Sequence, residues 1–400
     1  MMKRRSYLLL VGLAYLSFIS LGLPDGLLGV AWPSVRASFN LPIDALGALL
    51  VMFTAGYLLS SFISGALLAQ ISVGALLSLS CLATAVSLLG YATTPFWSVM
   101  VALGLLAGLG AGAIDAGLNT YAATHFSART VNWLHAFYGV GATIGPVIMT
   151  GVLVSGRPWQ SGYAIVGGFQ VLLAVCFGLT RRWWMNGGGR EASTQIPPRP
   201  ASSSSTLRLP VVWVSIAVFF IYTGLEAAAG AWAYSLFTES RGVPASVAGM
   251  WTSIYWGCLT AGRLLSGIVV GYVPLRVLLR LCIIGIALGA GMIWLNASGL
   301  TSFLGLALIG LSCAPVFPSL IATTPARLGE LHAANGVGFQ IAAAVLGQSL
   351  LPAAVGMLAH DLGLEIVGPS LLVMGIALLG FYEVLMATGS NPGREAEASV

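Results

Sequence analysis

Three acidic residues of this sequence lie inside long apolar stretches, where a carboxylate is costly. Asp115 is the sole Asp, Glu, Lys or Arg residue between positions 45 and 128, Asp25 interrupts the first apolar stretch, and Glu226 interrupts a later one. A carboxylate at the centre of a transmembrane helix costs about 2.5–3.5 kcal/mol on insertion scales, and acids kept there usually line a pathway or carry a proton. A low dielectric favours the protonated form of a carboxyl group, and water restores the ionised form. We therefore predict that Asp115, Asp25 and Glu226 couple proton movement to a conformational change.

A second set of residues has the chemistry to bind a neutral polyhydroxyl solute. Aromatic faces and side-chain amides suit such a solute, and Asn119 lies one helical turn from Asp115 on the same face. The residues that we assign to such a site, at the midplane between two halves of the chain, are Asn119, Trp232, Tyr255, Trp256, Gln340 and Gln348. For the two glutamines, hydrogen bonding between helices is an equally good interpretation.

The sequence offers little for catalysis or for metal binding. No His and carboxylate residues have metal-ligand spacing, and no Ser stands beside a candidate base in a known motif. The 5 cysteines all fall in apolar stretches without C-x-x-C spacing, as small apolar fillers do. We expect a protein that is not an enzyme and that needs no cofactor and no metal.

Composition identifies the elements that must position these residues. Hydrophobic residues make up 58% of the chain and charged residues 7%, with a mean hydropathy of +0.93. Soluble domains carry roughly 25% charged residues, and apolar stretches of about 18 residues or more are long enough to span a membrane. The net charge of +5 comes from residues scattered between the apolar stretches, which does not favour nucleic acid as a partner. The chain is predicted to be an all-α integral membrane protein.

Span length and polar interruptions predict twelve transmembrane helices. They cover residues 7–33, 45–69, 73–93, 96–123, 132–155, 161–180, 210–237, 246–271, 275–296, 300–324, 333–358 and 366–387. The apolar tract after Lys3 is too long for the core of a secretory signal, so it is interpreted as the first span.

The positions of the basic residues predict the orientation. With a cytoplasmic N-terminus, most Lys and Arg residues fall on the cytoplasmic side, and Arg36, Arg157 and Arg241 on the opposite side. This asymmetry follows the positive-inside rule. We expect a multi-pass protein of the inner (plasma) membrane with both termini in the cytoplasm.

The chain divides into two six-helix halves. Residues 181–209 contain Gly, Pro and Ser runs that cannot bury a core, so they are predicted to form a flexible cytoplasmic linker. This gives an N-terminal half at 1–180, a C-terminal half at 210–388 and a cytoplasmic tail at 389–400. The octets 134–141 (LHAFYGVG) and 331–338 (LHAANGVG) open spans 5 and 11, the same ordinal helix of each half, as expected of parallel repeats. His135 and His332 of these octets are predicted to be structural.

Three glycines mark a packing face on span 4. Gly104, Gly108 and Gly112 are spaced four residues apart, and small residues at that spacing let transmembrane backbones approach closely. Close packing explains these glycines, but it does not explain Asp115, which lies on the same span.

The whole pattern resembles the major facilitator superfamily: twelve spans arranged as six plus six, a central cytoplasmic linker and both ends inside. The loop between spans 2 and 3, a signature of that superfamily, keeps its glycines at 65–74 and lacks its charged residues. The corresponding loop of the second half is better kept, with Arg263 and then Arg276. The resemblance implies a gating role for these two arginines.

Within the superfamily, the segment 115–121 followed by 132–141 looks like the fucose permease branch of sugar:proton symporters. The resemblance implies that Asp115 is the proton-linked acid, with Asn119 a nearby amide and Asp25 a second acid. Here Asp stands for the usual Glu, Thr120 for a proline, and His135 and Tyr138 for the expected Gln and Asn, which brings Tyr138 to the substrate site. Spans 7 and 8, with Glu226 and Arg263, are similar to glucose-transporter-like relatives.

We therefore expect a secondary transporter that works by alternating access and takes up a neutral sugar-like solute with a proton. The alternative is proton-driven efflux of drugs or other small molecules. Residues 141–146 begin like the glycine-proline motif of drug antiporters, but Met149 and Thr150 replace the two glycines that should follow. The expected partners are the small-molecule solute, a proton and membrane lipid, with the protein acting as a monomer.

Overall fold

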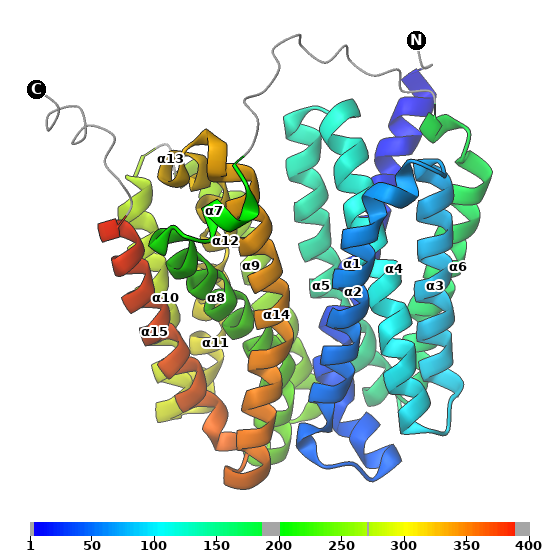
Figure 1. Cartoon of the computed structure of the whole chain (residues 1–400). Helices are drawn as coiled ribbons and strands as arrows, with labels where there is room; N and C mark the ends of the chain where they lie inside the picture. The colour runs from blue at the N-terminus through cyan, green and yellow to red at the C-terminus, as the bar shows by residue number, and fades with distance from the viewer. Residues whose placement is uncertain (1–3, 186–200, 270–271, 389–400) are drawn as a thin grey trace, which may run out of the picture. The chain divides into compact units, whose positions relative to one another are not determined.

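The computed structural model describes residues 4–185, 201–269 and 272–388, and these are almost entirely helical (Figure 1). The long helices before the linker are α1 (Arg4–Phe39), α2 (Leu46–Leu68), α3 (Val73–Thr93), α4 (Trp97–His125), α5 (Ala128–Val154) and α6 (Gln160–Thr180). Those after it are α8 (Pro210–Ser235), α9 (Ala245–Val269), α10 (Leu275–Leu295), α11 (Gly299–Cys313), α14 (Glu330–Leu362) and α15 (Val367–Thr388). Short elements complete the described chain: η1 (Ile43–Ala45), η2 (Trp183–Met185), α7 (Ser203–Thr206), η3 (Leu236–Ser240), α12 (Val316–Ala322), α13 (Thr324–Leu328) and η4 (Leu364–Ile366).

These helices confirm the predicted fold class, an all-helical membrane protein. Within the described residues, 11 helical segments are long and apolar enough to cross a membrane. The remaining long helix, α9, has 25 residues but a more polar composition, with Thr252, Ser253 and Arg263 along it. Every predicted span corresponds to a helix within a few residues, apart from one broken span and one longer span described next.

The predicted span at 300–324 corresponds to the membrane-length segment Gly299–Ala322, but its helix is interrupted. α11 ends at Cys313 and α12 begins at Val316, with Pro315 between them. Proline has no backbone N–H, so Pro315 leaves the carbonyl of Leu311 without its helical partner. The carbonyl oxygen of Cys313, at the end of α11, lies 2.9 Å from the Tyr222 hydroxyl oxygen. The first span is also longer than predicted, since α1 continues to Phe39.

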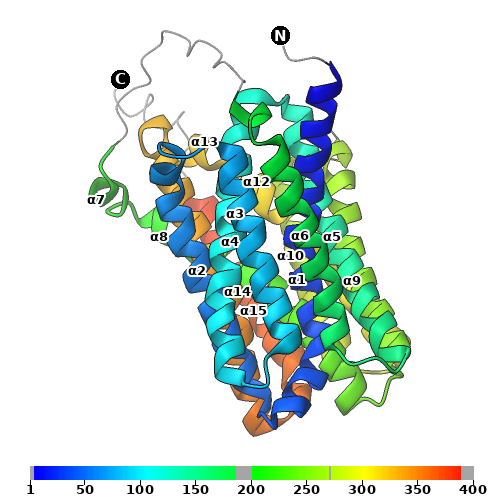
Figure 2. The same ribbon diagram turned by 90° about the vertical axis from the view of Figure 1, so that its right-hand side faces the viewer.

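The described chain forms two compact units. Unit 1 comprises residues 1–192, 230–260 and 353–366, and unit 2 comprises 193–229, 261–352 and 367–400. In unit 1, α1 packs on α5, α2 on α4, and α3 on both α4 and α6 (Figure 2). Buried side chains of several helices, among them Leu10, Phe18, Leu77, Ile114 and Phe177, form a core cluster of this unit.

The glycines of α4 confirm the predicted packing face. A Cβ atom at Gly108 would collide with the carbonyl oxygen of Phe53, and one at Gly112 would lie 2.5 Å from the carbonyl oxygen of Tyr57. Both partners belong to α2, so the absence of side chains at these positions lets α4 and α2 touch through their backbones. This close approach brings Tyr57 beside the next turn of α4, which carries Asp115.

Unit 2 repeats several of these pairings with the corresponding helices. α10 packs on α11 and α15, as α3 does on α4 and α6. Gly347 of α14 packs against the backbone of Phe220 of α8, and Gly262 of α9 packs against Leu311 of α11. These two contacts correspond to α1 with α5 and to α2 with α4.

The predicted linker and tail lie partly outside the described residues, namely at 186–200 and 389–400. The described end of the linker is bonded to the start of α14 within unit 2. Asn335 Nδ2 donates to the carbonyl of Ala201 at 2.7 Å, and His332 Nδ1 lies 2.9 Å from the Thr206 hydroxyl. His332 therefore has the structural contact that its place in the repeated octet predicted.

Candidate functional site

Asp115 is held by two hydrogen bonds inside unit 1. The Tyr57 hydroxyl of α2 donates to Asp115 Oδ2 at 2.7 Å, and Asn119 Nδ2 donates to Asp115 Oδ1 at 2.9 Å. Hydrogen bonds to an ionised acceptor are among the stronger ones in proteins. Each oxygen of the carboxylate thus accepts a hydrogen bond from an uncharged side chain.

Asp25 of α1, like Asp115, accepts a hydrogen bond from a tyrosine hydroxyl of another helix. The Tyr138 hydroxyl of α5 donates to Asp25 Oδ2 at 2.6 Å. A Cβ atom at Gly22 would collide with the carbonyl oxygen of Tyr138, so α1 and α5 are in backbone contact one turn from the acid. The helix packing that the sequence encodes through glycine therefore sets the distance between Asp25 and Tyr138.

Electrostatic contacts join the two acids into one polar cluster. The Asp25 carboxylate interacts electrostatically with the Tyr57 hydroxyl that donates to Asp115. The His135 imidazole interacts electrostatically with the Asp115 carboxylate. His135 also packs its ring edge-to-face against Phe18, with ring centres 5.4 Å apart. The cluster draws one or two side chains from each of α1, α2, α4 and α5. Protonation of one acid therefore changes its electrostatic interactions with side chains on other helices.

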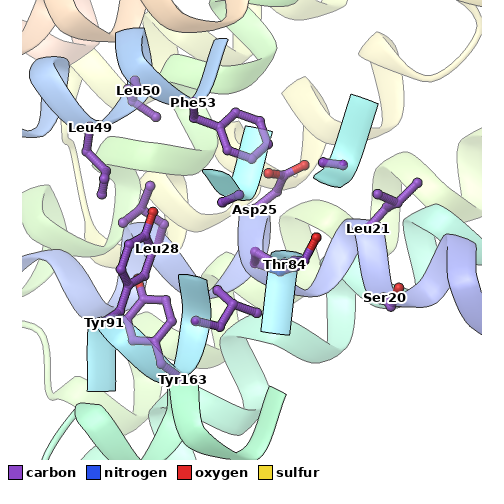
Figure 3. A pocket seen from close by; sticks show the side chains of 14 residues that line it. Ser20, Leu21, Asp25, Leu28, Leu49, Leu50, Phe53, Thr84, Tyr91 and Tyr163 are labelled. Atoms are coloured by element: carbon purple, nitrogen blue, oxygen red, sulfur yellow. The ribbon is translucent and has the colours of Figure 1, made fainter. Parts of the chain in front are cut away.

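A cavity of about 70 Å³ adjoins this cluster inside unit 1. Figure 3 shows the Asp25 carboxylate in it beside Phe53 and Thr84, with Tyr91 and Tyr163 together at its other end. The remaining lining residues are mostly apolar side chains of α1, α2, α3 and α4.

Glu226 lies in unit 2 and has partners of a different kind. It accepts a hydrogen bond from the Tyr222 hydroxyl, and its Oε1 is 3.8 Å from Arg263 Nη2. The structure thus brings together Glu226, predicted to couple protons, and Arg263, predicted to gate. Glu226 therefore has a basic side chain nearby in addition to its tyrosine partner.

The predicted aromatic residues of the substrate site are buried in unit 1. Trp232 and Tyr255 are fully buried, and Trp256 is 5% exposed. Trp256 packs over Gly230 and edge-to-face against Tyr255, while Trp232 packs over Gly356. These contacts account for the three side chains as packing groups, and their role in binding stays a prediction.

The remaining predicted residues lie in unit 2. Gln340 is buried and accepts from the Thr324 hydroxyl at 2.9 Å, as expected of a side chain that bonds between helices. Gln348 is exposed on α14, and Arg276 is exposed at the start of α10, where its carbonyl accepts from Tyr382 at 3.0 Å. Their roles also stay predictions.

Comparison with known proteins identifies the family. The sequence pattern of the Major Facilitator Superfamily matches residues 14–352. The chain belongs to the major facilitator superfamily. It is therefore a secondary transporter of small molecules and not an enzyme, as the sequence predicted.

Relatives of this transporter include proteins of two eukaryotes. It is 21% identical to Bypass of stop codon protein 6 of Saccharomyces cerevisiae over 380 residues, which are 87% of this chain and 76% of that protein. It is 33% identical to Major facilitator superfamily domain-containing protein 4A of Xenopus tropicalis over 157 residues, 38% of this chain and 30% of that protein. Neither name states a substrate.

Solved structures similar to this transporter come from several branches of the superfamily. A bacterial homolog of the human lysosomal transporter Spinster has a TM-score of 0.74 at 16% identity, covering 97% of this chain and 98% of that one. The D-xylose-proton symporter gives 0.71 at 14% identity, covering 94% and 98%. The E. coli fucose:proton symporter FucP gives 0.64 at 15% identity, covering 95% and 99%. Identities this low show the fold alone, and they leave the branch of this transporter open.

Sequence reasoning missed two contacts of the transporter. Tyr57 was not selected, although a tyrosine inside a membrane span usually needs a partner for its hydroxyl. Glu383 pairs with Arg280 through two contacts of 2.6 Å, and these residues are far apart in the sequence. The sequence contains each residue type but not the pairing.

Within the residues that the structure describes, no group of three or more His, Cys, Asp or Glu side chains could hold a metal ion.

Proposed function

We propose that the protein couples the uptake of a neutral, sugar-like solute to the entry of a proton. Asp115 is the residue on which the proposal depends, because its carboxylate lies in a membrane span and accepts hydrogen bonds from two uncharged side chains, Tyr57 and Asn119. A proton on Asp115 removes a negative charge from the centre of four packed helices. Asp25 is the second proton site, and Glu226 contributes through its pairing with Arg263.

The proposed substrate-binding residues of unit 1 are Asn119, Tyr138 and the three predicted aromatic side chains, and those of unit 2 are Gln340 and Gln348. Asn119 and Tyr138 each bond directly to one of the acids, so a solute that competes for these bonds would change the proton affinity of that acid. This is the physical link between solute and proton. Two of the similar structures, the D-xylose-proton symporter and the fucose:proton symporter FucP, are named for such a link between a sugar and a proton. Those names describe those proteins and not this one.

The proposed architecture consists of two six-helix halves, residues 1–180 and 210–388, joined by a linker at 181–209 and followed by a tail at 389–400. The recurrence of helix pairings between α1–α6 and the long helices after the linker supports it. The asymmetry of basic residues supports an inner-membrane location with both termini in the cytoplasm. We propose that each copy transports on its own, as a monomer.

Alternating access requires contacts that form in one state and break in the other. Within unit 1, Arg36 at the end of α1 pairs with Glu239 of η3 at 2.6 Å. A second pair in unit 1 involves Asp44 of η1, which follows α1: Asp44 Oδ1 lies 3.5 Å from His360 Nδ1 of α14. These pairs link residues before the linker to residues after it, so we propose that they stabilise the state in which this end of the pathway is closed.

Reversing one charge of the Arg36–Glu239 pair is expected to open that end more often. Partly exposed ion pairs contribute about 0.2–1 kcal/mol, so Arg36→Glu should raise the rate of maleimide labelling at Ala353→Cys roughly two- to fivefold. Ala353 packs against Gly47 and is covered while the segments touch. The labelling is measured in a background without the five native cysteines.

Two further variants make this test specific. The exchange Arg36→Glu with Glu239→Arg should return the labelling rate to its original value. Arg157→Glu, an exposed arginine in the loop between α5 and α6, should leave it unchanged. Equal labelling in the original and charge-reversed proteins would rule out a gating role for the pair.

The substrate class and the direction of coupling can be tested together. A thermal-shift screen of neutral pentoses, hexoses and common drugs on the purified protein should show stabilisation by a sugar, because a ligand stabilises the state that it binds. In proteoliposomes, an acidic exterior should then drive accumulation of that sugar. Stabilisation by drugs alone, with export towards the acidic side, would favour proton-driven efflux instead.

A further inference from the structure

The cavity beside Asp25 involves helices that carry none of the residues selected from the sequence. Tyr91 belongs to α3 and Tyr163 to α6, and both line the cavity together with Asp25 of α1 and Thr84 of α3. In Figure 3 the two tyrosine rings lie together at one end and the Asp25 carboxylate projects into the other. The cavity therefore extends from the acidic cluster towards α3 and α6. These two helices contribute no side chain to the cluster itself.

A buried polar atom of this cavity lacks a hydrogen-bond partner among the described residues. The Tyr163 hydroxyl is buried, with the residue 1% exposed, and it has no hydrogen bond. Outside the lining, Gln170 Oε1 and Ser17 Oγ, close to the lining residue Ser20, are also buried without partners. Gln170 Nε2 donates a hydrogen bond to the carbonyl of Ser20, and Ser20 Oγ donates one to the carbonyl of Ser17. These bonds fix the orientation of the Gln170 amide and the Ser20 hydroxyl. Buried polar groups are almost always satisfied, by protein or by ordered water.

Water fits the site in size and in chemistry. One water molecule occupies about 30 Å³ in the liquid, so a cavity of about 70 Å³ has room for it. Ordered internal water typically makes about three hydrogen bonds to otherwise unsatisfied groups. Asp25, Thr84 and the Tyr163 hydroxyl supply acceptors and donors, while most of the remaining lining is apolar.

We infer that this cavity is a water site through which Asp25 exchanges its proton. A hydronium in the cavity transfers one proton to the Asp25 carboxylate, which leaves a water molecule and a neutral carboxylic acid, and the reverse step returns the proton. The inference rests on the proposed proton role of Asp25 and adds a proton route within unit 1 that does not pass through the solute. Tyr163 acts as the anchor of the water and Thr84 as a second contact.

The test measures hydrogen–deuterium exchange at the Asp25 carboxyl group. Infrared spectra of the purified protein across a pH series identify the carboxylic acid band that Asp25→Asn removes, and its shift is then followed after mixing with D2O. Ala107→Leu fills the cavity from α4, and Tyr163→Phe removes the anchoring hydroxyl. Each is expected to slow the exchange about tenfold or more, because loss of one hydrogen bond to a buried polar group has an effect of that order.

A matched control and two contrary outcomes complete the test. Ala164 follows Tyr163 in α6 and is exposed. The substitution Ala164→Leu should therefore leave the exchange rate unchanged. An Asp25 band that exchanges at the original rate in both cavity variants would overturn the water site and leave the proton role of Asp25 intact. Absence of any band lost in Asp25→Asn would overturn that proton role, and the inference with it.

Discussion

Asp115→Asn is expected to abolish solute accumulation driven by a pH gradient while preserving exchange of solute down its own gradient. Asn has nearly the shape of Asp and can still accept from Tyr57 and contact Asn119, but it cannot bind the transported proton. With one proton per solute, a gradient of one pH unit can sustain about tenfold accumulation, since one unit corresponds to about 1.36 kcal/mol. The variant should reach no more than equal concentrations on both sides.

The measurement is uptake of the sugar found by the ligand screen, in proteoliposomes with and without an acidic exterior. Counterflow, in which unlabelled solute inside exchanges for labelled solute outside, reports whether the variant still binds and moves the solute. Asp361→Asn changes an exposed acid near the end of α14 and should accumulate normally. Full accumulation by Asp115→Asn would remove Asp115 from proton coupling.

Gly108→Leu is expected to destabilise the protein severely. The Cβ atom alone would collide with the carbonyl oxygen of Phe53, and it would lie 2.8 Å from the backbone nitrogen of Tyr57. Overpacking in a well-packed interior costs about 1–3 kcal/mol, and a clash with backbone is harder to relieve. The α2–α4 contact must open, which also separates Tyr57 from Asp115.

A melting experiment in detergent checks this expectation, with a predicted loss of at least about 5 °C. The control is Gly168→Leu on α6, where a Cβ atom would meet nothing within 4 Å. Glycine inside a helix is less favourable than alanine by roughly 0.8–1.0 kcal/mol, and leucine ranks next to alanine, so the control should melt at the same temperature or slightly higher. Equal melting of both variants would contradict the account of how α2 and α4 meet.

The helices could be predicted from the sequence because length and apolar content largely determine a membrane span. Each long helix corresponds to an apolar stretch bounded by polar or Gly-Pro residues, and the glycines of α4 correctly indicated a close contact. The break at Pro315 was missed because apolar residues continue on both sides of it. Hydropathy does not register the missing N–H that ends α11.

The candidate site could be predicted only in part. Costly residues such as Asp115 and Asp25 are visible one at a time, whereas their partners Tyr57 and Tyr138 lie on other helices, 58 and 113 positions away. Hydropathy also does not separate aromatic side chains that pack from those that bind. Trp232, Tyr255 and Trp256 were selected for their chemistry; the structure shows them buried, and their role in binding stays a prediction.

The central claim, that a proton travels with the solute, is tested most directly by proton movement in the absence of an imposed proton gradient. Proteoliposomes containing a pH-sensitive dye receive the identified sugar on the outside, with potassium and valinomycin clamping the membrane potential. The account predicts that the lumen acidifies with the original protein and that Asp115→Asn abolishes the signal. Alkalinisation of the lumen, or sugar entry without any pH change, would contradict it.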